Sequence, residues 1–251
     1  MLILIVGESM TGKSVSAATF PKPMKYFDFD GNRISIFNAK DKDGNLIVKD
    51  ADEIEFINMT RKEIQKIDLR ATASDAKSKG LPPTYSDSAA PLIDKLNKEI
   101  LAITNQTITV VMDSFTSMFR LWKDAFLFLN KIPQIRIQDY QSLEGVLFSQ
   151  FIPSLKALPC QYVVCVDHTD IDKDEIVGTI LEFPVGPSRN MGRQLGKAFD
   201  EVWLQRIHGG EYEWKLRAEG FFGSAGSRLH LPPTIKPPTF YELEKYLKKE
   251  Q

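Results

Sequence analysis

Eight residues near the N-terminus have the types and spacing needed to wrap a phosphate group. From Gly7 to Ser14 they follow the pattern G-x-x-x-x-G-K-[ST] in full. The glycines let the loop turn its backbone N–H groups inward, and the following helix adds the positive end of its dipole. Lys13 would reach the β- and γ-phosphates and Ser14 would ligate Mg²⁺. The pattern therefore predicts a nucleotide site formed by Gly7, Glu8, Ser9, Met10, Thr11, Gly12, Lys13, Ser14 and Val15.

A magnesium–nucleotide site also needs a carboxylate at the end of a nearby strand. Asp113 closes the β-branched run Thr107–Asp113. In open α/β sheets, ligands bind at the carboxyl ends of the strands, which is where Asp113 is expected. Asp113 is therefore the predicted second metal ligand. An acid at this position can instead cap the next helix.

Two further strand ends carry polar side chains. A strand at Met24–Asp30 would place Asp28 and Asp30 on one face, and Asp30 could orient and deprotonate a water molecule. The alternative is that Asp30-Gly31 serves only as a turn. His168 ends a fourth strand and could sense the γ-phosphate, although a lone histidine is often purely structural.

The elements that would position these residues alternate between strands and helices. Apolar runs predict strands at 2–6, 24–30, 107–113 and 161–168, and helical periodicity predicts helices at 13–20, 88–104, 114–130 and 140–158, the last kinked at Pro153. A turn at Asp43-Gly44 predicts a hairpin with 54–58 as its partner strand. A short helix at 61–69, a polar loop at 71–85 and an antiparallel hairpin at 200–218 complete the pattern. We expect one α/β domain over 1–251, with a C-terminal helix at 239–249 packed on it.

Composition narrows the classes of protein. The chain has 251 residues, 43% of them hydrophobic, and a net charge of -1, so it is not a strongly basic nucleic-acid-binding protein. Its two cysteines, Cys160 and Cys165, are too few for a disulfide scaffold. No apolar run is long enough for a signal peptide or a membrane span, which predicts a cytoplasmic protein without a membrane partner.

Taken together, these stretches resemble the RecA-like ATPase core, and specifically the Sak-type single-strand annealing or recombination proteins of phages. The resemblance rests on "GESMTGKS", "YFDFDGNR", "TVVMDSFTSM", "VVCVDHT", "GKAFDEVWL" and "GSRLHLPPTI". It implies a RecA-like P-loop NTPase core with a central, mostly parallel sheet flanked by helices and a C-terminal antiparallel hairpin. It also implies binding and hydrolysis of ATP with Mg²⁺, in the cytoplasm of an infected or lysogenic bacterial host.

The resemblance further implies roles for individual residues. Asp30 takes the position of the catalytic Glu, and His168 that of the sensor. Arg228, or alternatively Arg217, would act in trans on a nucleotide held between subunits of a homo-oligomeric ring or filament. Single-stranded DNA would contact two loops, the first with Lys131, Arg136 and Tyr140 and the second with Arg189, Arg193 and Lys197. A single-strand-binding protein would be a possible further partner.

Two other functions fit the same sequence. A P-loop kinase would use residues 187–197 as a lid over a small phosphoryl acceptor, although "DSFTSM" and "FDEVWL" argue against it. A nucleotide-dependent assembly or loader protein would bind ATP and oligomerise without turnover. The Asp-for-Glu change at Asp30 keeps this alternative open.

Overall fold

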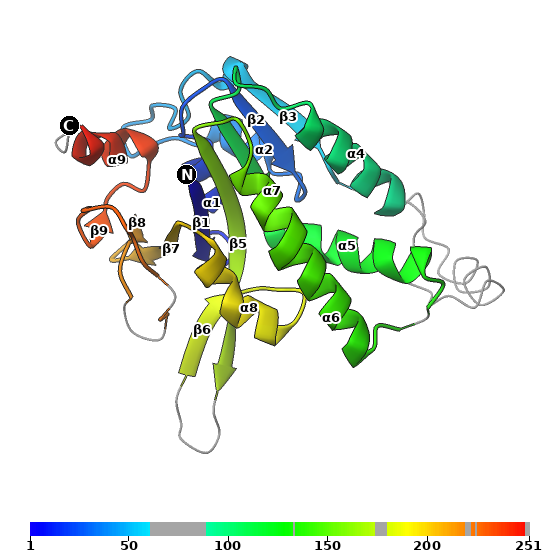
Figure 1. The fold of residues 1–251 in the computed structure, drawn as a ribbon. Coiled ribbons are helices and arrows are strands. Elements are labelled where there is room, and N and C mark those ends of the chain that lie inside the picture. The colour runs from blue at the N-terminus through cyan, green and yellow to red at the C-terminus, as the bar shows by residue number, and fades with distance from the viewer. Residues whose placement is uncertain (61–88, 133, 174–179, 219–221, 224, 249–251) are drawn as a thin grey trace, which may run out of the picture.

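The computed structural model describes residues 1–60, 89–132, 134–173, 180–218, 222–223 and 225–248 (Figure 1). The predicted helix at 61–69 and loop at 71–85 lie outside these residues. Within them the α-helices and β-strands are β1 (Leu2–Gly7), α1 (Lys13–Ala17), β2 (Met24–Asp28), α2 (Arg33–Asn38), β3 (Ile54–Asn58), α4 (Ala89–Leu101), β4 (Thr109–Asp113), α5 (Phe115–Leu129), α6 (Ile137–Val146), α7 (Ile152–Lys156), β5 (Tyr162–Lys173), β6 (Ile180–Pro184), α8 (Arg189–Leu195), β7 (Glu201–His208), β8 (Glu211–Lys215), β9 (Thr234–Ile235) and α9 (Phe240–Leu247).

The described strands form one sheet in the order β3-β2-β4-β5-β1-β7-β8-β9, and β6 pairs with β5. All pairings from β3 to β7 along this order are parallel. The pairings β5–β6, β7–β8 and β8–β9 are antiparallel. The predicted fold class, a mostly parallel sheet flanked by helices with a C-terminal antiparallel hairpin, is confirmed.

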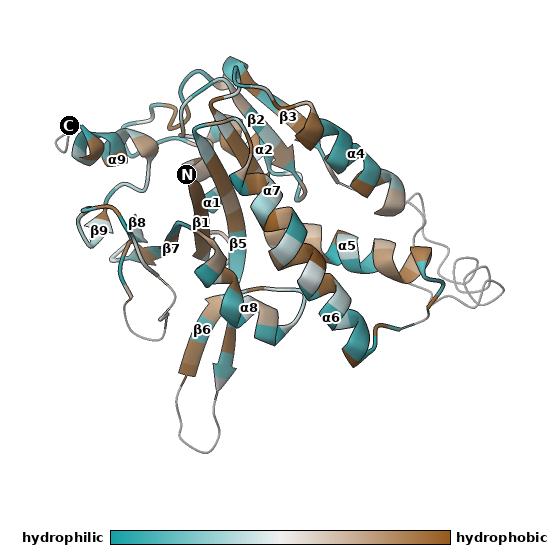
Figure 2. Cartoon of the chain, viewed as in Figure 1, coloured by the Kyte–Doolittle hydropathy of each residue, from teal (hydrophilic) through white to brown (hydrophobic). Residues whose placement is uncertain are grey.

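Both faces of the central strands are buried, as their continuous apolar runs predict. Every residue of β1 is buried. Leu2, Leu4 and Val6 point into one core shared with α4–α8. Ile3 and Ile5 point into a second core shared with α1, α2 and α9. Figure 2 shows β1 and much of β5 in brown, beside helices in which brown, white and teal residues alternate.

Two predicted elements differ from the structure. Residues 54–58 form β3, but β3 pairs in parallel with β2, and the hairpin turn instead closes with an isolated bridge between Lys40 and Leu46. The helix predicted at 140–158 divides into α6, a π-helical turn at Leu147–Phe151 and α7. Pro153 lies in the first turn of α7, where the absence of its backbone N–H costs the helix the fewest hydrogen bonds.

The end of β5 differs from the prediction as well. The strand continues past His168 to Lys173 and pairs with β6, a strand that the mixed composition of 169–198 does not indicate. This extension carries the hairpin away from the core sheet, toward the bottom of Figure 1. At the other side of the sheet, Phe240 of α9 packs against Phe20 and Tyr162. No described helix is long and apolar enough to cross a bilayer.

Candidate nucleotide-binding site

β1, β2 and β4 end near one another at one edge of the sheet, and β5 crosses this edge and continues to Lys173. Gly7 of β1 pairs with His168 of β5, and Asp113 of β4 pairs with Val166. β5 therefore lies between β1, which leads into the phosphate loop, and β4, which ends in Asp113. A cavity of about 480 Å³ opens at this edge, and its lining includes Lys13, Ser14, Asp30, Asp113 and His168.

The phosphate loop has the backbone geometry of a nest that faces this cavity. Gly12 has φ 82° and Met10 has φ 64°, both in the left-handed region. Lys13 folds back over the loop, and its ammonium donates to the carbonyl oxygens of Gly7 (2.8 Å) and Glu8 (2.5 Å). Burial lowers the pKa of Lys13 to about 8, although the nearby carboxylate of Asp113 opposes this shift. A bound phosphate would supply the negative charge that favours the ammonium form.

Asp113 is fully buried behind Ser14. Its Oδ2 accepts from the Tyr26 hydroxyl (2.6 Å) and from Nδ2 of Asn32 (3.4 Å), which also donates to Ser14 Oγ (3.2 Å). Burial raises the pKa of Asp113 to about 6, and the hydrogen bonds from Tyr26 and Ser14 oppose the rise. At neutral pH the group is therefore mostly an anion whose hydrogen-bond donors are neutral.

This oxygen set fits Mg²⁺ bound together with a nucleotide. Magnesium prefers hard oxygen ligands, and it commonly takes one or two from protein and the rest from phosphates and water. Ser14 and Asp113 would supply the protein oxygens. Among the described residues there is no group of three or more His, Cys, Asp or Glu side chains that could hold a metal alone. A cation held by Ser14 and Asp113 would take its remaining oxygen ligands from phosphates and water.

Asp28 and Asp30 have different environments, contrary to the prediction that they share a strand face. β2 ends at Asp28. The buried Asp28 carboxylate accepts from the backbone amides of Gly31 (2.7 Å) and Asn32 (3.0 Å), so it shapes the turn after the strand. Asp30 is exposed and lines the cavity. Of the two acids, Asp30 is the one with access to a water molecule beside a bound phosphate.

His168 is half-buried and lines the same cavity. Burial lowers its pKa, and the charge of Lys13 lowers it further, so the imidazole is neutral at pH 7. Its backbone N–H donates to Asp167 Oδ1 (2.9 Å) and Thr116 Oγ1 (3.3 Å), and the Thr116 hydroxyl donates to the same Asp167 oxygen (2.6 Å). His168 is thereby tied to the first turn of α5, directly after Asp113.

Arg228 does not join this group of residues. Its backbone N–H donates to Glu201 Oε1 (2.8 Å), and Glu201 lies opposite Ile3, near the start of β1. The phosphate loop follows the other end of that strand. The Arg228 side chain is 73% exposed, with Nη1 4.0 Å from Asp200 Oδ1. The alternative, Arg217, is also exposed.

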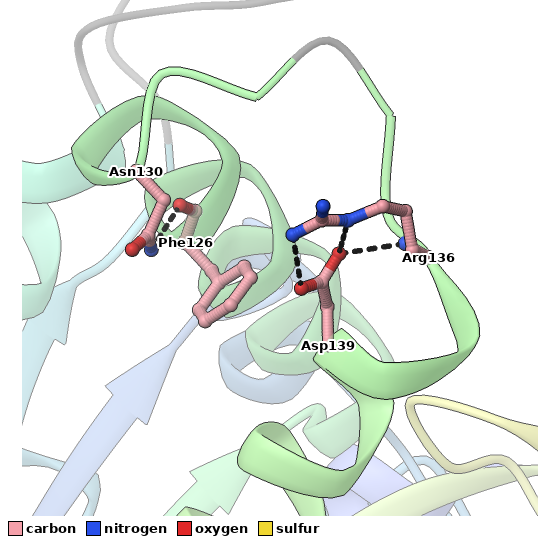
Figure 3. Close-up of polar contacts among 4 residues, drawn as sticks. All are labelled: Phe126, Asn130, Arg136 and Asp139. Atoms are coloured by element: carbon pink, nitrogen blue, oxygen red, sulfur yellow. Dashed lines mark hydrogen bonds and ion pairs between the residues drawn. The ribbon is translucent and has the colours of Figure 1, made fainter.

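In the first predicted DNA loop, the arginine is held by a carboxylate (Figure 3). Nε and Nη2 of Arg136 donate to Asp139 at 3.0 and 3.1 Å, and the backbone N–H of Arg136 donates to the same group at 2.8 Å. Together these bonds cap the start of α6. Lys131 is exposed, whereas Tyr140 is half-buried against the core.

In the second predicted DNA loop, two arginines converge on Asp172 of β5. Arg189 Nη1 lies 3.5 Å from Asp172 Oδ1, and Arg193 Nη2 contacts Oδ2. Arg189 and Arg193 keep 67% and 48% of their side-chain surface exposed. Lys197, in the 3-10 turn Gly196–Ala198 that directly follows α8, is exposed. The cluster of Asp172, Arg189 and Arg193 therefore has more positive than negative charge, near the outer end of the described β5–β6 pairing.

The structure adds polar partners that the sequence motifs do not identify. Tyr26 and Asn32 contact the predicted metal ligands, and Thr116 and Asp167 hold His168. Strand alternation signals Tyr26, because it shares a face with Asp28 two residues on. Asn32 and Thr116 have no such signal, since their places depend on loop and helix starts from separate parts of the chain.

Comparisons with known proteins add little to this geometry. No protein-family model matches the chain, and no curated protein matches it in sequence. The flagellar accessory protein FlaH from Methanocaldococcus jannaschii is 11% identical, with 93% of this chain and 83% of that chain covered and a TM-score of 0.36. An ATPase from the type III secretion system of pathogenic bacteria is 13% identical, with 82% and 52% covered and a TM-score of 0.42. This chain thus spans about half the length of the secretion ATPase, and neither score is high enough to support an inference.

Proposed function

We propose that the protein binds Mg²⁺–ATP at the phosphate loop and hydrolyses it as a RecA-like ATPase. One observation carries the proposal: Lys13, Ser14, Asp30, Asp113 and His168 line a single cavity although they come from four separate parts of the chain. Lys13 and the loop amides would bind the phosphates, and Ser14 and Asp113 the metal. Asp30 would orient the attacking water, and the neutral His168 would contact the γ-phosphate.

We further propose that the ATPase acts on single-stranded DNA, with annealing or recombination in a phage as its role. Two features support this: the exposed cations around Asp172, and the link from His168 through β5 to the same hairpin. A γ-phosphate that displaced His168 would move the strand that carries this cluster. In this proposal the nucleotide lies between subunits, because Arg228 is too far from its own loop to act in cis.

Steady-state hydrolysis tests both parts. ATP turnover should be stimulated by single-stranded DNA, more so at low than at moderate salt, and should be lost in Lys13→Ala. Turnover that ignores DNA, with no DNA binding in the presence of ATP, would exclude the annealing role. ATP-dependent assembly without turnover would favour the loader alternative, which the shorter side chain of Asp30 leaves open.

A further inference from the structure

Gln205 of β7 contacts the phosphate loop from the side that faces away from the nucleotide cavity. Its side chain is buried, and Nε2 donates to the carbonyl oxygen of Thr11 at 2.5 Å. Thr11 and Gln205 both line a second hollow of about 380 Å³, whereas Gly12 lines the nucleotide cavity. Ser9 and Met10 line both spaces, whereas the two residues joined by the Thr11–Gly12 peptide bond each line a different one.

Trp214 fixes which end of the Gln205 amide faces the loop. β7 and β8 pair so that Gln205 lies opposite Trp214, and the indole Nε1–H donates to Gln205 Oε1 at 2.9 Å. An indole can only donate, so the atom it contacts must be the amide oxygen. The NH₂ group is then left to face Thr11. Trp214 is itself immobilised in the core against Phe20 and Trp203.

Because the peptide between Thr11 and Gly12 is planar and trans, the contact of Gln205 with the Thr11 carbonyl also sets the direction of the Gly12 N–H. The carbonyl of Thr11 and the N–H of Gly12 belong to one peptide unit and point in opposite directions. Because Gln205 holds the carbonyl on its own side, the Gly12 N–H is turned toward the nucleotide cavity. Gly12 has φ 82°, so the backbone here is in a conformation that glycine adopts without strain.

We propose that Gln205 is a positioning residue for the nucleotide: it orients the Thr11–Gly12 peptide so that the Gly12 N–H donates to a phosphate oxygen, and Trp214 keeps the glutamine amide in the required orientation. The inference rests on the proposed binding of ATP. It explains why a neutral amide occupies this buried place. A carboxylate would set one anionic oxygen against the Thr11 carbonyl, and an apolar side chain would leave that carbonyl free to turn into the cavity.

The test is the Kd for Mg²⁺–ATP, measured by calorimetry together with thermal unfolding of each nucleotide-free variant. Gln205→Met should weaken ATP binding about tenfold and Gln205→Glu about 10- to 100-fold, the range for one charge-assisted hydrogen bond. Trp214→Phe should weaken binding by a smaller factor. Trp122→Phe is the matched control, since Trp122 of α5 packs against Phe119 and Phe151 in the other core, and it should bind ATP within about twofold of wild type.

Non-additivity separates positioning from general loss of stability. If Trp214 acts through Gln205, Trp214→Phe should add nothing further to the Kd of Gln205→Met, even where it lowers the thermal unfolding temperature further. Folded variants of Gln205 that bind ATP as tightly as wild type overturn this inference alone. Wild-type protein that binds no ATP overturns the proposed function and the inference with it. If Gln205→Glu does not fold, the Gln205→Met and Trp214→Phe pair gives the same decision.

Discussion

Replacing Gly7 by alanine should displace the phosphate loop, because the last residue of β1 touches the backbone of β7. A Cβ atom at Gly7 would lie 2.3 Å from the carbonyl oxygen of Gln205 and 3.1 Å from Thr11 Oγ1. An ordinary contact between such atoms is about 3.4 Å, so β1 and β7 would have to separate locally by about 1 Å. The Cβ position is fixed by the backbone of β1, and the oxygen it meets is a backbone atom of β7, so no side-chain rotamer change relieves the contact.

The size of the effect follows from this overlap. Overpacking a buried site commonly costs about 1–3 kcal/mol of unfolding free energy, and Gly7→Ala should fall in that range. The Thr11 hydroxyl, which donates to the Glu8 carbonyl at 2.9 Å, would be pushed as well. A shift of this size in the loop should weaken ATP binding at least tenfold, because oriented N–H groups lose their alignment.

Urea denaturation without nucleotide and calorimetric titration with Mg²⁺–ATP measure the two effects separately. Gly145→Ala is the control, since a Cβ at Gly145 of α6 meets no atom within 4 Å. It should leave ATP binding unchanged and stabilise the fold by up to about 1 kcal/mol. The reasoning is refuted if the free energy of unfolding of Gly7→Ala lies within about 0.5 kcal/mol of the wild-type value and the variant binds ATP with the same Kd.

Three further predictions follow from the polar groups around the cavity and the hairpin. Burial raises the pKa of Asp167 to about 8, so the folded protein keeps a proton that the unfolded chain releases above about pH 4. The free energy of unfolding should therefore fall as the pH rises from 4 to 8, and urea titrations of Asp167→Asn should show a shallower fall. An equal slope in the two proteins would contradict the raised pKa. Tyr26→Phe removes a hydrogen bond that keeps the pKa of Asp113 from rising above about 6. The variant's Asp113 should therefore be more protonated at pH 6 than at pH 8, and the variant should lose more Mg²⁺–ATP affinity at pH 6. An equal loss of affinity at both pH values would count against Asp113 as the metal ligand. Asp172→Asn should release Arg189 and Arg193 and tighten single-stranded DNA binding about two- to tenfold at low salt, whereas Arg193→Ala should weaken that binding. Fluorescence anisotropy with labelled single-stranded DNA measures both effects. No change in either variant would contradict the assignment of these residues to the DNA site.

Local sequence patterns predict much of this fold because the pattern and the burial have the same cause. β1 and β4 are continuous apolar runs, and each is buried along its whole length. The phosphate loop is specified by glycine and lysine at fixed spacing, which requires no knowledge of distant residues. Asp113 and His168 are predictable because the apolar runs of parallel strands reach the same edge of the sheet, even though β5 continues as a strand beyond His168.

Other features depend on pairings that no local pattern contains. β3 has the composition of a hairpin strand, yet it finds its partner in β2, across a parallel crossover. β6 lies in a stretch of mixed composition and forms only because β5 continues past the sheet. Gln205 reaches Thr11 across 194 positions of sequence, so its contact follows from the pairing of β7 with β1.

The arginines show the same limit at the level of side chains. A basic loop predicts free cations, but Arg136 is bound by Asp139 three residues on, and Arg193 by Asp172 on another element. A carboxylate at position i+3 is visible in the sequence as a helix-capping pattern, so the first pairing was predictable. The second depends on where α8 lies against the β5–β6 hairpin.

Titration of Mg²⁺–ATP into wild-type protein and Lys13→Ala, with and without Mg²⁺, tests the central claim most directly. Wild type should bind ATP in a magnesium-dependent manner, and Lys13→Ala should bind at least about 100-fold more weakly, because it loses the cation that reaches the β- and γ-phosphates. Equal binding by the two proteins, or no binding by wild type, would contradict the assignment of this loop as a nucleotide site.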